Sequence, residues 1–177
     1  KNYQMMILQF PFYNKETREI RSSEIDFIIN KDTLITVTDG HLPPILELFD
    51  TLEQHPEAVT KNTKDDLGNL LYEILERLLH HVFPMLNHIS QDLDSIENNI
   101  LNQEPVGRES TNDILIIKRN IVNFRRIMQS HKEVIKRLLV QSNSFIDTKK
   151  IERHFNTLID YTIEAWASLE NYRDTIN

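Results

Sequence analysis

The amino-acid sequence predicts an α+β fold. A small partial β-sheet packs with helices, and a long antiparallel helical hairpin and a long C-terminal helix follow. The first forty residues carry short apolar runs bounded by polar turn residues, as β-strands do. From about residue 43 onward, apolar residues return every three or four positions, which indicates helices that bury one side. The chain has only 3 Gly in 177 residues, which disfavours many-turned β folds and glycine-rich nucleotide loops.

Three strands are expected near the N-terminal end, at residues 3–10, 25–29 and 34–37. The last two are separated by Asn30-Lys31-Asp32, a sequence suited to a hairpin turn. Three strands make a piece of a sheet rather than a complete one, so we expect a further partner strand before Lys1.

Two helices are expected next. A short one begins at Pro43-Pro44, because proline is favoured in the first helical turn, and ends before His55-Pro56. A long one covers about residues 65–101, with its apolar side chains along one seam. Pro84 lies inside this pattern and has no amide hydrogen, so it should kink or split the long helix near residues 80–83.

Two further helices complete the chain. One starts near Ser110, keeps a seam with 3–4 spacing to Leu138 and is followed by a break at residues 142–148. The short loop that precedes it, about ten residues long, implies an antiparallel hairpin with the helix before. The last helix runs from Ile151 to Asn177 without Pro or Gly, and its seam continues to the end. We therefore expect this helix to continue beyond the chain.

The two arms of the hairpin differ in charge. Between Leu78 and Gly107 there is no Lys or Arg, whereas the stretch from Lys118 to Arg137 has seven basic residues and one acid, Glu133. The acids of the first arm are Asp92, Asp94, Glu97 and Glu104, and the bases of the second are Lys118, Arg119, Arg125, Arg126, Lys132, Lys136 and Arg137. Two interpretations remain open: one arm neutralises the other, or the acidic arm faces a cation-rich space in an oligomer.

The composition argues against several classes of function. Without Cys, the chain has neither disulfides nor thiolate metal sites. A net charge of -7 argues against nucleic acid as a partner, since phosphate binding needs clustered Lys and Arg. No apolar run reaches the roughly 18 residues that a membrane span needs. Because no P-loop, nucleophile elbow, dinucleotide-binding or metal-triad spacing occurs, we expect no enzyme.

Histidines form the densest group of candidate metal ligands, at His80, His81 and His88. Adjacent residues point about 100° apart on a helix, so one ion cannot readily bind both His80 and His81. A helical zinc site instead uses positions i and i+4. Solvated or packed histidines are therefore the simpler interpretation. His131 lies on an apolar seam, so we expect it to be buried or interfacial rather than a ligand.

The order of these parts, together with several short motifs, resembles the cytoplasmic domain of the CorA family of divalent-cation channels. The strongest local match is the run 117–126, Ile-Lys-Arg-Asn-Ile-Val-Asn-Phe-Arg-Arg. It is similar to a K-R-x-[LI]-[VI]-x-x-R-[RK] pattern on the second arm of the family's hairpin. Residues 70–72, 101–105 and 170–174 also resemble the family's pattern.

The resemblance implies a truncated αβα sandwich of CorA type that acts as the cytoplasmic regulatory or gating domain of a Mg²⁺/Co²⁺ transport channel. Its parts would be a sheet and short helix (1–62), the helical hairpin (63–147) and the start of a stalk helix (148–177) leading to transmembrane spans outside the chain. The full-length protein would be a homopentamer in the cell membrane. Mg²⁺, Co²⁺ or Zn²⁺ would be the transported or regulatory ion, and no cofactor would be required.

The regulatory ion ligands of the family do not carry over to this sequence. Where some members place an Asp and a His on the stalk, this chain has Thr157 and Tyr161, and an acid of the long helix falls at His80 or His81. The remaining candidate metal ligands are His81 and Asp160. A zinc-transporting ZntB-like member, in which His would suit the ion, is one alternative. A self-associating helical scaffold without transport is the other.

Overall fold

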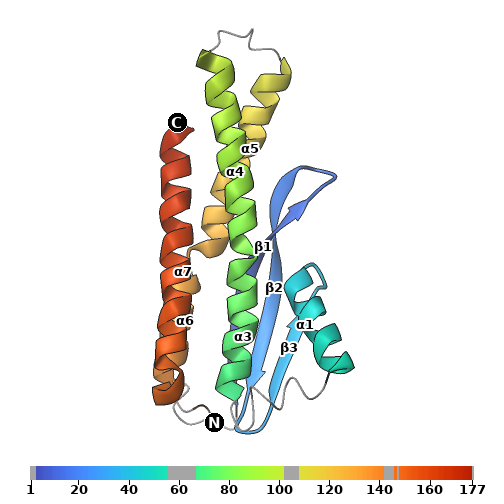
Figure 1. Ribbon diagram of the computed structural model, residues 1–177, viewed down its shortest axis with the longest axis vertical. Coiled ribbons are helices and arrows are strands. Elements are labelled where there is room, and N and C mark those ends of the chain that lie inside the picture. The colour runs from blue at the N-terminus through green and yellow to red at the C-terminus, as the bar shows by residue number, and fades with distance from the viewer. Residues whose placement is uncertain (1–2, 56–66, 102–107, 142–145, 147, 177) are drawn as a thin grey trace.

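The computed structural model describes residues 3–55, 67–101, 108–141, 146 and 148–176. Its elements are β1 (Gln4–Asn14), β2 (Glu19–Ile29), β3 (Leu34–Thr38), α1 (Pro43–Gln54), α3 (Leu67–His80), α4 (Val82–Leu101), α5 (Arg108–Met128), α6 (His131–Gln141) and α7 (Thr148–Thr175). Helices α4 to α6 contact the sheet, and α7 packs against α3 to α6 from the other side, as Figure 1 shows. The α+β class predicted from the sequence is confirmed.

The sheet is antiparallel, with strand order β1-β2-β3. Its inner face is apolar because alternate residues, among them Phe10, Ile25 and Phe27, point toward the helices and are fully buried. The predicted turn between the second and third strands is confirmed. It is closed by the Asn30 amide, which donates to the Thr33 carbonyl at 3.0 Å.

The first two strands are longer than predicted. They form one hairpin of two 11-residue strands, whose register pairs Gln4 with Ile29 and Asn14 with Glu19. Local polar chemistry makes the turn: the Asn14 side-chain oxygen accepts the amides of Glu16 and Thr17, at 2.9 and 3.0 Å. The prediction ended the first strand at Phe10 and took Asn14-Lys15 as the boundary of the apolar run, whereas the strand continues to Asn14.

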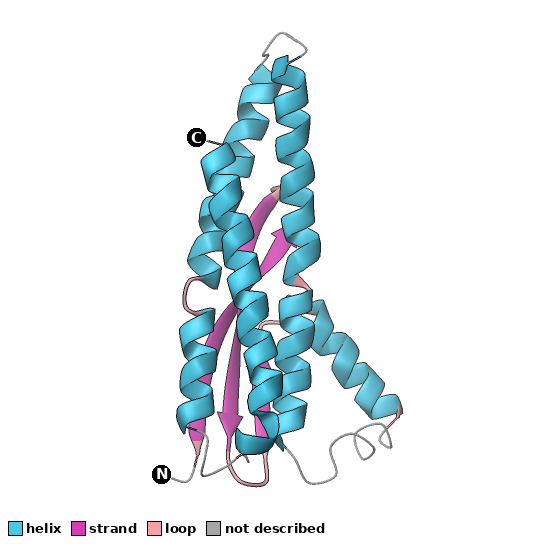
Figure 2. Cartoon of the chain, turned by 60° about the vertical axis from the view of Figure 1, so that its left-hand side comes forward, coloured by secondary structure: helices cyan, strands magenta, loops and turns pink. Residues whose placement is uncertain are grey.

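The long first arm divides at a single residue, His81, as the position of Pro84 predicts. Proline cannot donate the amide hydrogen that would bond the His80 carbonyl, so the helical ladder is interrupted there. The His81 amide still bonds the Arg77 carbonyl at 3.1 Å, which keeps α3 and α4 nearly continuous (Figure 2).

The second arm also divides, and here the prediction of one helix was wrong. Helix α5 ends at Met128 and α6 begins at His131, with Gln129 and Ser130 in a turn. The carbonyl of Ser130 accepts the Val134 amide at 3.0 Å, so α6 starts from a residue type that favours helix N-termini. The predicted break at residues 142–148 lies largely outside the described residues.

Helix α7 buries the seam predicted for it. Ile151, Phe155, Leu158, Ala165 and Leu169 are buried against the other helices. Its C-terminal end lies toward the same end of the molecule as the end of α4 and the start of α5 (Figure 1). In the described part of the chain, no helix is long and apolar enough to cross a membrane.

Candidate functional site

The run 117–126 of α5, which carries the family resemblance, lies between the sheet and α7. Asn120 is buried within it and uses both ends of its amide on the β1–β2 hairpin. Its oxygen accepts the Ile20 amide at 2.8 Å, and its nitrogen donates to the Arg18 carbonyl at 3.0 Å. Asn123 adds a bond to the Ile20 carbonyl at 3.3 Å. One turn of α5 thus holds the hairpin by its backbone.

Ion pairs surround this contact at the surface. Arg18 pairs with Asp113 of α5 at 2.8 Å, and Arg119 pairs with Glu19. The hydrogen bond from Arg119 lowers the pKa of Glu19, although both partners are substantially solvated and each pair contributes little stability. Arg18 has φ 58, a left-handed conformation that a side chain rarely adopts without support. The Asn120 bond to its carbonyl provides that support.

The other side of the same run contacts α7. Arg125 pairs with Glu170, and its guanidinium carbon lies 5.3 Å from the centre of the Trp166 ring, a cation–π distance. Arg173, one turn along α7 from Glu170, pairs with that same carboxylate at 2.9 Å. Through Asn120 and Arg125, the run therefore links the hairpin to the C-terminal helix.

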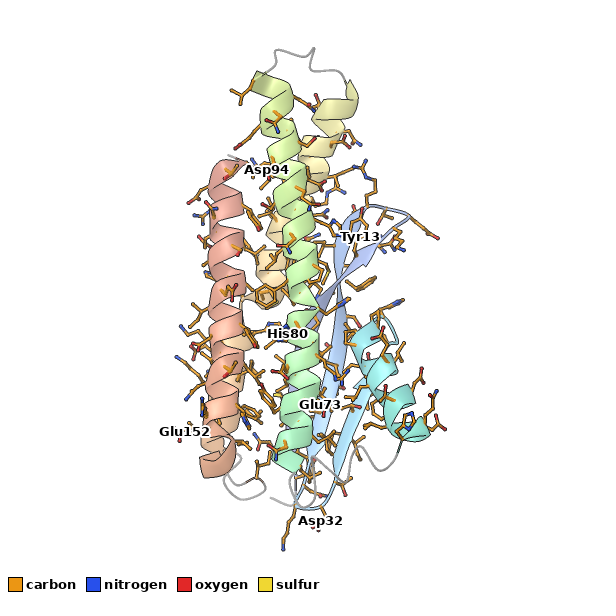
Figure 3. The ribbon with its side chains drawn as sticks, viewed as in Figure 1. Tyr13, Asp32, Glu73, His80, Asp94 and Glu152 are labelled. Carbon is orange, nitrogen blue, oxygen red and sulfur yellow. The ribbon has the colours of Figure 1, made fainter. Side chains whose placement is uncertain are left out.

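The two candidate metal ligands, His81 and Asp160, take no part in this link and share no described contact. His81 is half-buried at the helix break, where burial lowers its pKa and Glu47 of α1 acts in the opposite direction. Asp160 is exposed on α7. The histidine that does reach α7 is His80, which Figure 3 labels. The centre of its ring lies 4.8 Å from the centre of the Tyr161 ring.

Tyr161 and Thr157 stand at the stalk positions where the family resemblance implies ion ligands, and both make contacts of another kind. Tyr161 packs edge-on against His80 and lies 6.1 Å from Phe83, ring centre to ring centre. Thr157 donates its hydroxyl to the Arg153 carbonyl of its own helix at 3.3 Å. Across the residues the structure describes, no group of three or more His, Asp or Glu side chains is placed to hold a metal ion.

An open groove of about 550 Å³ lies between α3 and α7, lined by Asn69, Tyr72, Glu73, Glu76, Arg77 and His154. Its carboxylates are already engaged: Glu73 pairs with Arg77 at 2.9 Å, and Glu76 accepts the Tyr72 hydroxyl. Burial, together with the Glu76 bond, raises the pKa of Tyr72. The stacked rings of Tyr72 and His154, 4.8 Å apart, make this groove a packing surface rather than a cation site.

Among the described residues of the helical hairpin, the two charged arms form no direct ion pairs with each other. Asp92, Asp94 and Glu97 of α4 are exposed, and none pairs with a described base of α5 or α6. Arg119 instead pairs with Glu19 of the β1–β2 hairpin, and Arg125 pairs with Glu170 of α7. Glu104 lies outside the described residues.

Asn120 was not singled out from the sequence, although its signal is visible there. It falls on the apolar side of α5, beside Ile117, Ile121 and Phe124, where a polar side chain must find partners. Sequence alone gives no indication that those partners are backbone groups about a hundred residues away.

A model of the family described as CorA-like Mg²⁺ transporter protein matches residues 1–177. The chain is 23% identical over 180 residues to the cobalt/magnesium transport protein CorA of Thermotoga maritima, and the match covers 100% of this chain and 49% of that protein. The chain thus spans about half the length of this relative.

Two solved structures have the same fold. The soluble domain of CorA from Methanocaldococcus jannaschii gives a TM-score of 0.82 at 19% identity, covering 99% of this chain and 67% of that one. The ZntB cytoplasmic domain of Vibrio parahaemolyticus gives 0.76 at 16% identity, covering 99% and 66%. At these identities the likeness shows the fold.

Proposed function

Because the chain belongs to the family of CorA-like Mg²⁺ transporter proteins, we propose that it is the cytoplasmic gating domain of a membrane protein that transports Mg²⁺ or Co²⁺. The observation that carries the proposal is the family match over every residue of the chain. The parent protein would sit in the cell membrane as a ring of identical subunits, five by the family's pattern. Helix α7 would lead from this domain into the membrane part.

Gating in this proposal is mechanical. Helix α7 packs along the helical layer, and Arg125 fastens it to α5 through Glu170 and Trp166. The same segment of α5 holds the β1–β2 hairpin through Asn120. A shift of α7 would therefore be transmitted to the sheet, and two packings of α7 would be the states whose populations an ion changes.

The acidic side chains of α4 would act on the cation before transport. Asp92, Asp94 and Glu97 lie in the second half of α4. Figure 3 shows Asp94 toward the end of the molecule to which α7 leads. Carboxylates that pair with no described base leave a negative potential that raises the local cation concentration.

Ion uptake by the purified parent protein in liposomes tests the proposal. A Mg²⁺-sensitive dye inside the vesicles should report uptake when external Mg²⁺ is added, and a Co²⁺-quenched dye should report Co²⁺ entry. Protein-free vesicles are the control. Absence of uptake for every divalent cation would favour the self-associating scaffold, and uptake of Zn²⁺ alone would favour the zinc transporter.

The zinc alternative rests on the stalk contact. On the long helix, where some family members place an acid, this chain has His80, whose ring packs against Tyr161. Imidazole is a better ligand for Zn²⁺ than for Mg²⁺. Thermal unfolding of the parent protein with each ion at millimolar concentration separates the two. A rise in Tm with Mg²⁺ and none with Zn²⁺ supports the Mg²⁺/Co²⁺ assignment, whereas the reverse supports zinc.

A further inference from the structure

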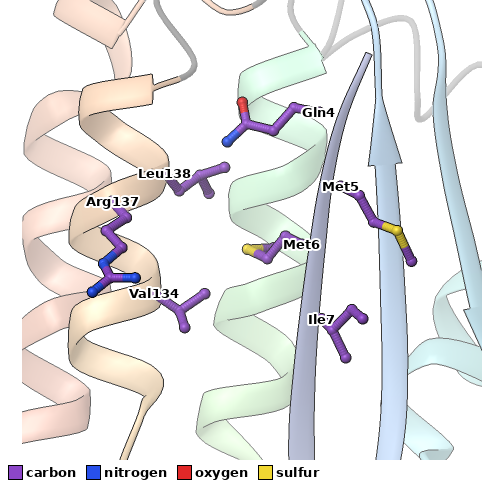
Figure 4. A pocket seen from close by; sticks show the side chains of 7 residues that line it. All are labelled: Gln4, Met5, Met6, Ile7, Val134, Arg137 and Leu138. Atoms are coloured by element: carbon purple, nitrogen blue, oxygen red, sulfur yellow. The ribbon is translucent and has the colours of Figure 1, made fainter.

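The groove between α3 and α7 differs from two other cavities in having a histidine, His154, in its wall. Histidine is the side chain whose charge changes between about pH 5 and pH 8. The cavity of about 200 Å³ between β1 and α6, shown in Figure 4, has Arg137 as its ionisable side chain. A cavity of about 330 Å³ beside the α5–α6 turn has Lys132 and Glu133. Of these three, the α3–α7 groove is therefore the one that can respond to protons near neutral pH.

A single ring contact joins His154 of α7 to Tyr72 of α3. The two rings are stacked, with their centres 4.8 Å apart and their planes inclined by 27°. The Tyr72 ring also lies 6.4 Å from that of buried Phe155, and its hydroxyl donates to Glu76. Burial, and then the bond to Glu76, raise the pKa of Tyr72, so the phenol keeps its hydrogen and stays neutral. The imidazole thus faces a neutral aromatic ring whose position is fixed by other contacts.

The charges that α3 presents to His154 in this groove are negative on balance. Glu73 and Glu76 carry two negative charges, and Arg77 carries one positive charge. Arg77 pairs with Glu73 at 2.9 Å. Glu76 accepts a neutral donor, the Tyr72 hydroxyl, and this bond leaves its charge uncancelled. An imidazolium in this place is attracted by the Glu76 carboxylate and by the π face of Tyr72.

The described charges on the other elements around His154 are balanced. On α7, the neighbouring residues Glu152 and Arg153 are exposed, opposite in sign and absent from the groove wall. The side chain of Lys150, four residues before His154, lies outside the described residues. Helix α6 also packs on α7, but none of its described side chains lines this groove. The charge that decides the behaviour of the imidazole therefore comes from α3.

We propose that His154 is a proton-responsive contact between α7 and α3, which tightens when its imidazole takes up a proton. The charged ring is held by the Tyr72 face and the Glu76 carboxylate, whereas the neutral ring only stacks. Because the proton binds more strongly when α7 lies against α3, the contact is strengthened at low pH, and this gain is lost as the pH rises. A fall in pH therefore favours the packed position of α7. That protons would thereby bias gating rests on the proposed function.

Hydrogen exchange in the full-length parent protein tests the contact. The variant His154→Phe keeps an aromatic ring over Tyr72 and cannot take up a proton. Protection factors of the amides from Ile151 to Leu158 are compared between the unsubstituted protein and this variant at pH 8 and at pH 5.5. Changes in global stability with pH act on both proteins alike and cancel in the ratio. Because transport is not measured, the result does not depend on whether the parent transports ions.

The ratio of protection factors, unsubstituted protein over His154→Phe, should be about 5-fold larger at pH 5.5 than at pH 8. One exposed cation–π contact and one exposed ion pair together typically supply a factor of this size. A ratio that is the same at the two pH values, or smaller at pH 5.5, would overturn the proposal.

His41 provides the matched control, because its ring stacks on Phe12 at the same 4.8 Å distance and belongs to neither α3 nor α7. His41→Phe should leave the exchange of residues 151–158 unchanged at both pH values. If its effect on these amides equalled that of His154→Phe, the loss of any stacked histidine would suffice, and the proposal would fail.

Glu76→Gln tests the source of the attraction. It keeps an acceptor oxygen for the Tyr72 hydroxyl and removes the negative charge. When both proteins of the comparison carry Glu76→Gln, the change in the ratio between pH 8 and pH 5.5 should fall to about 2-fold, which the Tyr72 ring alone can supply. An undiminished 5-fold change would contradict the part assigned to Glu76.

Discussion

Asn120 shows how one side chain can join parts of the chain that are about a hundred residues apart. Its amide meets one donor and one acceptor of the hairpin backbone, a match that no apolar residue could make. Removing it would leave the Ile20 amide without its partner in a buried place, and an orphaned buried donor costs more than the bond itself contributes.

Asn120→Ala is therefore expected to lower the free energy of unfolding by about 2 kcal/mol. Urea-induced unfolding followed by circular dichroism measures the change. Asn112→Ala, at an exposed position of the same helix, should stay within about 0.5 kcal/mol of the unsubstituted chain. Equal effects of the two substitutions would show that the hairpin contact adds nothing specific.

His131 is the second residue whose surroundings decide its behaviour. It is fully buried at the break between α5 and α6, with its ring 4.8 Å edge-on from Phe10, and neither ring nitrogen bonds a described group. Burial lowers the pKa of His131 to about 4 from 6.5, while the nearby backbone of Met128 and Ile127 acts in the opposite direction. The imidazole is therefore neutral in the folded protein at pH 7.

A stability loss in acid follows from His131. Below pH 6.5, His131 binds a proton in the unfolded chain, whereas in the folded chain it stays neutral down to about pH 4. Its contribution to the free energy of unfolding therefore falls as the pH is lowered from 6.5 to 4. The loss approaches about 3 kcal/mol at pH 4, at 1.36 kcal/mol per pKa unit. In His131→Leu this part of the slope should vanish, as seen by urea unfolding at pH 7, 6, 5 and 4. An unchanged slope would show that carboxylates alone cause the acid sensitivity.

Among the helices, α5 links two parts of the molecule, because its two sides contact different elements. One side carries the hairpin through Asn120, and the other holds α7 through Arg125. Arg125 contributes by geometry as much as by charge, since its planar guanidinium can stack over Trp166 while it bonds Glu170.

Arg125→Lys should therefore loosen α7 although it keeps the charge. We expect amides near Glu170 to exchange about 5-fold to 10-fold faster, equivalent to about 1–1.4 kcal/mol of lost local stability. Hydrogen exchange with mass spectrometry measures this. Arg126→Lys, the exposed neighbour with no described ion-pair partner, should leave α7 unchanged. Faster exchange in both variants would mean that the effect is not specific to the Arg125 contact.

Sequence patterns predicted those elements whose cause is local. Pro84 lacks an amide hydrogen, so the break at His81 could be anticipated, and the seam of α7 follows from its spacing. The break after Met128 could not, because no Gly or Pro marks it and the packing of His131 against Phe10 involves a distant strand. The link through Asn120 was missed for the same reason. His81 and Asp160 were candidate ligands because of their residue types and their places on the long helix and the stalk.

Charge is distributed unevenly along the long axis of the molecule. The acidic part of α4 lies toward the same end as the C-terminal end of α7 (Figure 1), while the bases Arg119 and Arg125 form ion pairs with the β1–β2 hairpin and with α7. If α7 leads to a pore, cations arriving from this side would pass the field of Asp92, Asp94 and Glu97 before reaching it. That field is long-ranged at low salt and screened within about 8 Å at physiological ionic strength.

Neutralising these acids should consequently slow transport in a salt-dependent way. For the triple change Asp92→Asn, Asp94→Asn and Glu97→Gln in the full-length parent, we expect Mg²⁺ flux across liposomes to fall about 3-fold at 10 mM salt. At 0.5 M salt the difference should disappear, because the field is already screened there. The matched control removes the three acids of α1 instead, as Glu47→Gln, Asp50→Asn and Glu53→Gln. A flux loss that persists at high salt, or that is equal in the control, would contradict a local electrostatic role for α4 and point to a change in packing or net charge.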